Sequence, residues 1–172
     1  MGETIKRIWN WISAIIVGVV VALAIALVGV RLVGLTPFVV LSGSMEPHYH
    51  IGSLIYVKSV DYRELKAGDP ITYMVNDNTV VTHRIERVIQ DETEPNTLWF
   101  VTKGDANKTE DGAPVHYRNV IGKAVFSIPY LGYLSSYIQS PPGLYVAISV
   151  CVVLLVAAFW PMPKKKDPET SG

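Results

Sequence analysis

Two long apolar stretches near the ends of the chain enclose a more polar middle. Apolar side chains occupy 16 of the 19 positions in residues 12–30 and 16 of the 17 positions in residues 144–160, and neither stretch contains a charge. A helix needs about 20 predominantly apolar residues to cross the hydrocarbon core of a bilayer. The pattern therefore predicts one transmembrane helix over residues 11–31 and a second over residues 143–161.

Basic residues outside these stretches predict their orientation. Lys6 and Arg7 precede the first stretch, and three lysines follow the second. Because basic residues flanking a membrane helix favour the cytoplasmic side, we expect cytoplasmic tails at residues 1–10 and 162–172 and an extracytoplasmic domain at residues 36–140. A buried helical hairpin is an alternative for both stretches. A cleaved signal peptide is an alternative for the first, although that stretch is long for one and lacks a small-residue cleavage pattern.

Composition excludes several classes of protein. The 15 basic and 15 acidic residues give a formal net charge of zero, so the basic excess of a nucleic-acid-binding protein is missing, and we expect no nucleic acid partner. Cys151 is the only cysteine and lies in the second apolar stretch, which excludes a secreted domain held together by disulfides. The expected partner of the two ends is a lipid bilayer.

The middle domain has the pattern of a mainly β fold. Short runs rich in Val, Ile, Thr, Tyr and Phe alternate with Gly, Pro, Asn and Asp, which is typical of strands and turns. Asn76-Asp77-Asn78 predicts a hairpin, and residues 62–66 predict a short helical turn. No amphipathic helix of ordinary length is expected in this domain. The predicted strands are residues 37–41, 53–60, 71–75, 79–89, 97–103 and 120–128.

The fourth predicted strand places a histidine on an apolar face. Side chains in a strand alternate between the two faces, so one face carries Val81, His83, Ile85, Arg87 and Ile89. A lone histidine on such a face is more often a core residue with satisfied hydrogen bonds than a catalyst. The pattern alone does not identify a site.

A serine-rich turn follows the first predicted strand. Ser44 lies between Gly43 and the Met45-Glu46-Pro47 segment, which favours a turn that exposes its hydroxyl group. Serine is a poor nucleophile unless a neighbouring base takes its proton, and a carboxylate commonly orients that base. Taken alone, the segment is more typical of an ordinary loop.

Four motifs in order resemble the type I signal peptidases of the archaeal and endoplasmic-reticulum kind. The resemblance extends over residues 37–128, and the order of the motifs after an apolar segment makes it specific. Bacterial members have a lysine base where this chain has His83, which assigns the chain to the histidine branch. The motifs are Leu41-Ser42-Gly43-Ser44-Met45-Glu46-Pro47, His83-Arg84-Ile85, Gly104-Asp105-Ala106-Asn107 with Glu110-Asp111-Gly112, and Ile121-Gly122-Lys123-Ala124.

The resemblance implies a role for each matching residue. Ser44 matches the nucleophile and His83 the general base. Asp105 and Asp111 match the two aspartates of the branch, and we choose Asp111 for the triad, although spacing alone does not rank them and a solvated turn is the alternative for both. Ser42 matches a hydroxyl that helps to stabilise the oxyanion in the bacterial relatives. Apolar side chains at Phe38, Val39 and Met45 are candidates to line the substrate groove, and core packing is an equal alternative for the first two.

The implied activity is that of a membrane-bound serine endopeptidase that removes signal peptides from secreted preproteins after small residues. No cofactor or metal is expected. The expected partners are preproteins that carry a signal peptide and, beyond them, the protein translocation machinery. The expected location is the cell membrane, or the endoplasmic reticulum membrane in a eukaryote.

Some features fit this interpretation less well. Pro70 stands where the family usually has a branched aliphatic residue. His48 and His50 could suggest zinc, but only Glu46 is close enough in sequence to complete the ligand set. His116 matches no motif of the family. The alternatives are a noncatalytic membrane-anchored β module that scaffolds other membrane proteins, and a self-cleaving domain of the repressor type, which uses lysine as its base and has no membrane helix.

Overall fold

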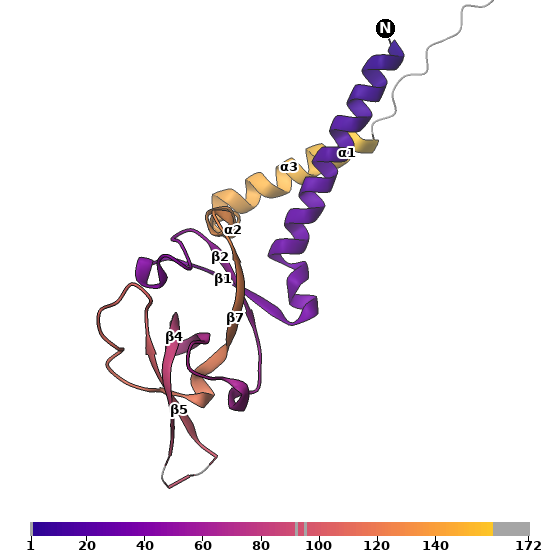
Figure 1. Cartoon of the computed structure of the whole chain (residues 1–172). Coiled ribbons are helices and arrows are strands. Elements are labelled where there is room, and N and C mark those ends of the chain that lie inside the picture. Colours follow the sequence, from indigo (N-terminus) through magenta and orange to yellow (C-terminus); the bar gives the residue numbers. More distant parts are fainter. Residues whose placement is uncertain (1, 92, 95, 160–172) are drawn as a thin grey trace, which may run out of the picture.

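The structure is a computed structural model that describes residues 2–91, 93–94 and 96–159 (Figure 1). It consists of a long amino-terminal helix, a domain built on one seven-stranded sheet, and two consecutive helices after the last strand. Residues 160–161 of the second predicted membrane helix, and the whole predicted tail at residues 162–172 with its three lysines, lie outside the described residues.

Every neighbouring pair of strands in the sheet is antiparallel, in the order β1-β2-β7-β3-β4-β5-β6. The mainly β fold is thereby confirmed, and each of the six predicted strands is present with its ends within two residues of the expected ones. The predicted hairpin joins the third and fourth strands. The strands are β1 Leu35–Val39, β2 Leu54–Lys58, β3 Pro70–Asn76, β4 Thr79–Gln90, β5 Leu98–Lys103, β6 Val115–His116 and β7 Val120–Ile128.

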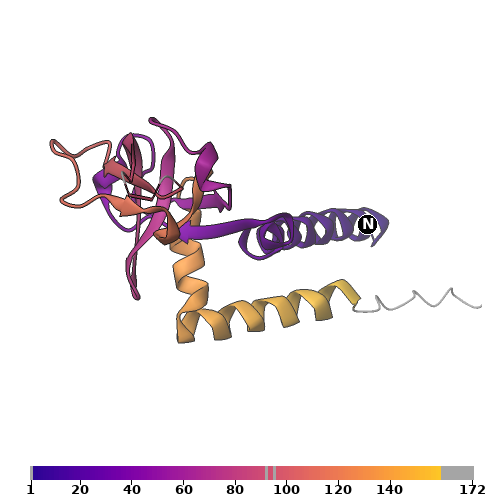
Figure 2. The same ribbon diagram turned by 90° about the horizontal axis from the view of Figure 1, so that it is seen from below.

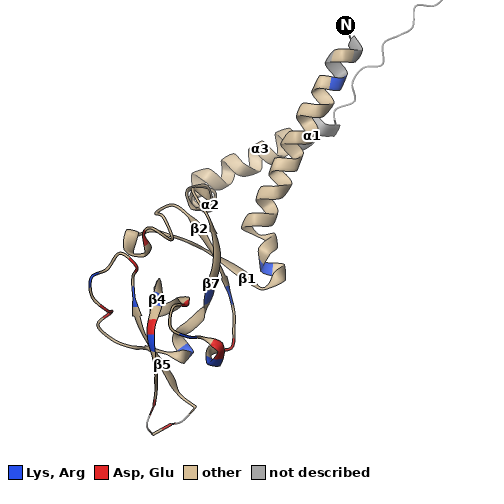
Figure 3. Ribbon diagram, in the orientation of Figure 1, with Lys and Arg blue, Asp and Glu red and all other residues tan. Residues whose placement is uncertain are grey.

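The amino-terminal helix α1 extends over Gly2–Leu27. Its segment Arg7–Leu27 is long and apolar enough to cross a membrane, and none of its most apolar window is buried in the structure. Figure 3 shows that charged residues gather on the strand domain and are nearly absent from this helix. The short 3-10 helix η1, Gly29–Val33, then leads into β1.

Two helices follow β7, α2 at Leu131–Gln139 and α3 at Pro141–Phe159. They meet at an angle of 98°, and the pair is long and apolar enough to form a second span only if both helices are counted as one bent element. Gly143 makes this corner possible, because a Cβ atom there would lie 1.8 Å from the carbonyl oxygen of Tyr137. In Figures 1 and 2, α1 and α3 leave the same side of the strand domain.

The sheet carries two apolar clusters, one in each half. The half formed by β1, β2 and β7 buries Ile55, Val57 and Ala124. The half formed by β3 to β6 buries a larger set. Both halves are joined by the pairing of β3 with β7. The larger cluster consists of Leu65, Ile71, Tyr73, Ile85, Phe100 and Val115.

Three features differ from the sequence-based expectations. The helix α2 was not expected, because its nine residues are too few to show a clear helical period. The two-residue strand β6 was not expected either. In β4, His83 and Ile85 face inward as predicted, but the register against β5 shifts between Ile85 and Arg87. Arg87 and Ile89 are therefore exposed instead of sharing the buried face of His83.

Candidate active site

Ser44 lies in the 3-10 turn η2, Gly43–Met45, between β1 and β2. The turn ends at Glu46, whose extended backbone is the conformation that a following proline favours. Met45 is 2% exposed and fixes the turn to the core, whereas the Ser44 side chain lines an open cavity. The turn thus buries Met45 and presents the preceding Ser44 side chain to the cavity.

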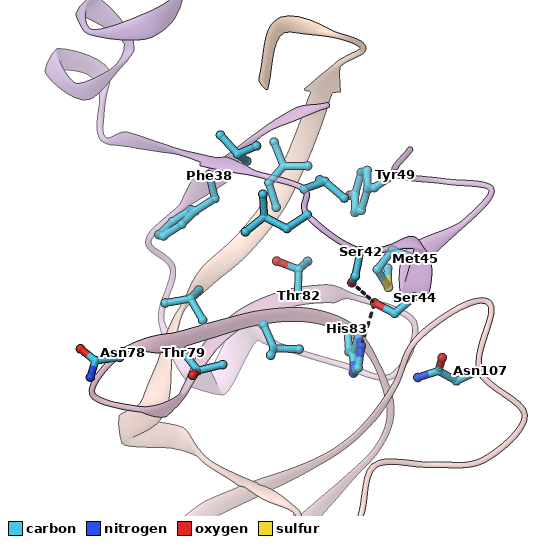
Figure 4. A pocket seen from close by; sticks show the side chains of 16 residues that line it. Phe38, Ser42, Ser44, Met45, Tyr49, Asn78, Thr79, Thr82, His83 and Asn107 are labelled. Atoms are coloured by element: carbon cyan, nitrogen blue, oxygen red, sulfur yellow. Dashed lines mark hydrogen bonds between the residues drawn. The ribbon is translucent and has the colours of Figure 1, made fainter. Parts of the chain in front are cut away.

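His83 lies in the middle of β4 and is 8% exposed. Its Nε2 atom is 3.1 Å from the Oγ atom of Ser44 (Figure 4), and its Nδ1 atom is 2.6 Å from Oδ2 of Asp111. An ionised carboxylate only accepts hydrogen bonds, so Nδ1 carries the proton in this contact. The neutral ring then presents the lone pair of Nε2 to the Ser44 hydroxyl.

Asp111 lies in the loop after β5 and returns toward that strand. Its backbone N–H donates to the carbonyl oxygen of Thr102 at 2.9 Å. Its Oδ2 atom accepts hydrogen bonds from the hydroxyls of Thr102 at 2.6 Å and Tyr73 at 3.1 Å, in addition to that from His83. Burial raises the pKa of the Asp111 carboxyl, but the three hydrogen bonds outweigh burial and hold the pKa below its usual value.

Asp105 has different partners. Its two carboxylate oxygens accept two hydrogen bonds from Arg84, at 2.8 and 2.7 Å, and Oδ2 is 2.9 Å from Nδ1 of His48. Burial raises the pKa of Asp105, and the contacts with Arg84 and His48 outweigh burial and lower it. Among the described residues, no hydrogen bond joins Asp105 to His83 or to Ser44. The structure therefore brings Asp111, and not Asp105, against the histidine.

The loop that holds Asp105 supports the backbone of Ser44. The N–H of Ala106 donates to the carbonyl oxygen of Ser44 at 2.9 Å. Gly104 packs so closely there that a Cβ atom would lie 2.6 Å from the same oxygen. Arg84, in β4, ties the loop to that strand through Asp105, and it also donates to the carbonyl oxygen of Gly68, in the turn before β3, at 2.7 Å.

Ser42 lies beside Ser44, with its Oγ atom 3.3 Å from that of Ser44. Both hydroxyls line a cavity of about 590 Å³ (Figure 4). Phe38, Val39 and Met45 also line the cavity, as predicted. Residues 79–83 of β4 form the opposite wall. The cavity is thus apolar along much of its length and polar at the serine and histidine.

His50 and His116 have no contact with this network among the described hydrogen bonds and ion pairs. His50 is 2.5 Å from Glu46 through its Nδ1 atom, and His116 stacks edge-on against Trp99. Within the part of the chain that the structure describes, no group of three or more His, Cys, Asp or Glu side chains could hold a metal ion.

Three residues of this network were not singled out from the sequence. Arg84 is the second residue of the histidine motif, and its position there was an available signal. Thr102 lies two residues after the buried Phe100 in β5 and shares its face of the strand. Tyr73 has the same relation to the buried Ile71 in β3. Polar side chains at inward positions of two strands are a signal that a buried polar group lies between them.

The fourth motif supports the sheet and does not reach the site. Lys123 in β7 makes an ion pair with Asp69, with 2.6 Å between Nζ and Oδ1. Gly122 allows close approach of the chain, because a Cβ atom there would lie 2.3 Å from the carbonyl oxygen of Lys58. This motif joins the two halves of the sheet near the turn before β3.

Comparison with known proteins gives a consistent result. Residues 8–94 match the family described as "Signal peptidase, peptidase S26", a region that includes Ser44 and His83 and ends before the two aspartates. The chain is 42% identical to "Signal peptidase I W" of Bacillus subtilis (strain 168), over 67% of this chain and 63% of that protein. It is 29% identical to "Signal peptidase complex catalytic subunit SEC11C" of Homo sapiens, over 64% of this chain and 60% of that protein. The match thus covers less than two thirds of either relative.

Proposed function

Because the chain belongs to the peptidase S26 family of signal peptidases, we propose that it is a membrane-bound serine endopeptidase that removes amino-terminal signal peptides from preproteins, cutting after small residues. The observation that carries this proposal is the chain of contacts from the Ser44 hydroxyl through the His83 ring to the Asp111 carboxylate. A nucleophile, a base and a group that orients the base are the parts that acyl transfer by serine requires.

The proposed mechanism proceeds in two stages. His83 takes the proton of Ser44 through Nε2 as Oγ attacks the carbonyl carbon of the scissile bond, and then gives that proton to the leaving amine. Asp111 stabilises the imidazolium that forms between these steps. The amide of Ser44 and the hydroxyl of Ser42 are the proposed donors to the oxyanion. Water then hydrolyses the acyl enzyme with His83 again acting as the base.

The cavity suits an extended peptide. The outer edge of β1 has no strand partner among the described residues. The first part of β4 pairs only with β3, because pairing with β5 begins at Arg84. Two open strand edges therefore flank the cavity, and a substrate backbone can pair with either. Phe38 and Val81 supply apolar walls for small side chains.

We further propose a topology with two membrane helices, at residues 11–31 and 143–161, and cytoplasmic tails at residues 1–10 and 162–172. The domain at residues 36–140 then lies outside, next to preproteins that emerge from the translocation machinery. The departure of α1 and α3 from the same side of the domain supports this arrangement. Confinement of enzyme and preprotein to one bilayer raises their effective concentration without tight binding.

The test is cleavage of a preprotein by the full-length chain in liposomes. We expect the parent to release the mature protein, and Ser44→Ala and His83→Ala to lose at least about a thousandfold in rate, because the triad acts as a unit. Ser149→Ala, in the apolar stretch of α3, is the control for loss of a serine hydroxyl. Undiminished cleavage by Ser44→Ala would contradict the proposal, and absence of cleavage by any form would leave the noncatalytic β module.

A further inference from the structure

Three hydrogen bonds converge on one oxygen atom of the candidate active site. Oδ2 of Asp111 accepts from His83, from Thr102 and from Tyr73, and the two hydroxyls are themselves 3.2 Å apart. The hydroxyls come from two different strands, β3 and β5, on either side of β4. The carboxylate is thus held from the strands that flank the histidine.

Both hydroxyls are deeply buried. Thr102 is 0% exposed and Tyr73 is 5% exposed. Burial of a hydroxyl group is unfavourable unless it finds a partner, and the same sheet shows a simpler solution, because Thr72 and Thr82 pair with one another at 2.8 Å. Thr102 and Tyr73 instead direct their protons toward a carboxylate.

The arrangement keeps the tyrosine as a donor. Burial and the neighbouring Asp111 charge raise the pKa of Tyr73 to about 12, although the Thr102 hydroxyl, 3.2 Å away, acts in the opposite direction. The phenol therefore stays protonated at any pH at which a serine peptidase works. The ring also meets the His83 ring edge-on, with 6.5 Å between centroids.

We propose that Tyr73 and Thr102 are positioning residues that fix the Asp111 carboxylate against Nδ1 of His83 and limit how strongly that carboxylate attracts the histidine proton. This inference rests on the proposed function and adds residues that act through Asp111 without touching the substrate. The geometry supports this proposal because all three donors bind the same atom, Oδ2. When one donor is lost, the two that remain interact more strongly with the negative charge of that oxygen.

The sign of the expected pH effect follows from this geometry. With one donor removed, the negative charge on Oδ2 is less neutralised, and it stabilises the imidazolium form of His83 more strongly. In such a variant, His83 stays protonated, and so cannot act as a base, up to a higher pH. The acidic limb of the pH dependence of kcat/KM should move to higher pH, which loss of fold stability alone would not produce.

The experiment measures kcat, KM and the pH profile of the full-length protein in detergent, with a fluorogenic signal-peptide substrate. We expect Thr102→Val and Tyr73→Phe each to lower kcat by about 10- to 150-fold, the range for a lost hydrogen bond to a charged group. KM should stay within about twofold, and the acidic limb should rise by about 0.3–1 pH unit. Thr102→Ser keeps the hydroxyl and should restore the parent profile.

Matched controls separate this role from general packing. Thr72→Val removes a buried hydroxyl from β3, and Tyr62→Phe removes a phenol hydroxyl outside the site; both should leave the acidic limb unchanged. An equal loss at every pH, or parent activity in Thr102→Val, would overturn the inference. Failure of the proposed function is distinguishable, because cleavage would then be absent from the parent or would survive Ser44→Ala.

Discussion

The two halves of the strand domain make different contributions to the site. The half built on β1, β2 and β7 contributes Ser44 from the turn η2, and the half built on β3 to β6 contributes His83 from a strand and Asp111 from the loop after β5. The histidine and its aspartate are held by side chains of neighbouring strands. The serine is held through its backbone. In the proposed mechanism, the half with His83 thus holds the base and the half with Ser44 presents the nucleophile, and both halves border the cavity.

At the site, the two halves meet through a few backbone atoms. Ala106 donates to the Ser44 carbonyl, and Gly104 leaves room for that approach. Asp105 and Arg84 hold the loop that carries these atoms. The two aspartates of one loop therefore have separate tasks in the proposed mechanism: Asp111 orients the base, and Asp105 holds the nucleophile in reach.

Replacement of Asp111 and of Asp105 by asparagine, one at a time, should give the largest difference in activity between the two tasks. We expect Asp111→Asn to lower kcat by about 10⁴-fold, because an amide can favour the wrong tautomer of His83. Asp105→Asn should cost far less activity, since Asp105 does not contact the ring. The measurement is kcat on a signal-peptide substrate for both variants. A larger loss for folded Asp105→Asn would transfer the triad role to Asp105.

Displacement of Ser44 should have the next largest effect. In Gly104→Ala, the new Cβ atom would lie 2.6 Å from the Ser44 carbonyl oxygen and 2.8 Å from Nδ2 of Asn107. We expect kcat to fall by about 10²-fold, the cost of a misplacement of about 1 Å in a catalytic group. Gly112→Ala is the control in the same loop, because nothing lies within 4 Å of its added Cβ atom. Equal activity in the two variants would show that the contact between the halves tolerates movement.

Stability at acid pH tests the contribution of the Asp105 carboxylate, which holds the loop through Arg84 and His48. The pKa of Asp105 is lower in the folded protein than its usual 3.8, so its charge stabilises the fold above that pH, and the contribution is lost as the pH falls through the lowered value. We expect Asp105→Asn to have a lower Tm than the parent at pH 7, and the difference to shrink as the pH is taken below 3.8. Thermal unfolding in detergent measures both. A difference that is constant with pH would assign the effect to packing.

The strands and the apolar helix could be predicted because their signals are local. β-Branched runs and the Asn76-Asp77-Asn78 turn mark the β3–β4 hairpin, and an uncharged apolar run marks α1. The short strand β6 and the helix α2 carry no such signal, because their formation depends on docking against β5 and the corner before α3. The bulge after Ile85 likewise depends on the register with β5, which a single strand does not encode.

The site could be predicted in part for a similar reason. Ser44 and His83 stand in motifs that a family resemblance identifies, but the roles of Asp105 and Asp111 depend on the path of a loop. The bond from the Asp111 N–H back to Thr102 turns that carboxylate toward the histidine. This fold of the loop back onto β5 is a tertiary contact that the sequence does not reveal. The six-residue spacing of the aspartates would allow either of them to contact His83.

The smallest expected effect concerns the half with the nucleophile and its link to the membrane helix. Tyr56 in β2 is 0% exposed, stacks on Phe126, and donates to the carbonyl oxygen of Ala26 at 2.8 Å. This carbonyl lies in the last turn of α1, where helix carbonyls lack partners within the helix.

We expect Tyr56→Phe to keep the ring packing and to lose about 1 kcal/mol of stability, the usual net value of such a bond. That loss corresponds to a Tm lower by roughly 2–4 °C in a chain of this size. Cleavage of a short soluble substrate should be unchanged, because the histidine half is not touched. Tyr62→Phe is the matched control, since its hydroxyl donates to the carbonyl oxygen of Asn96 at an exposed position. If both variants shift the Tm equally, the bond to α1 does not join this half of the domain to its membrane helix.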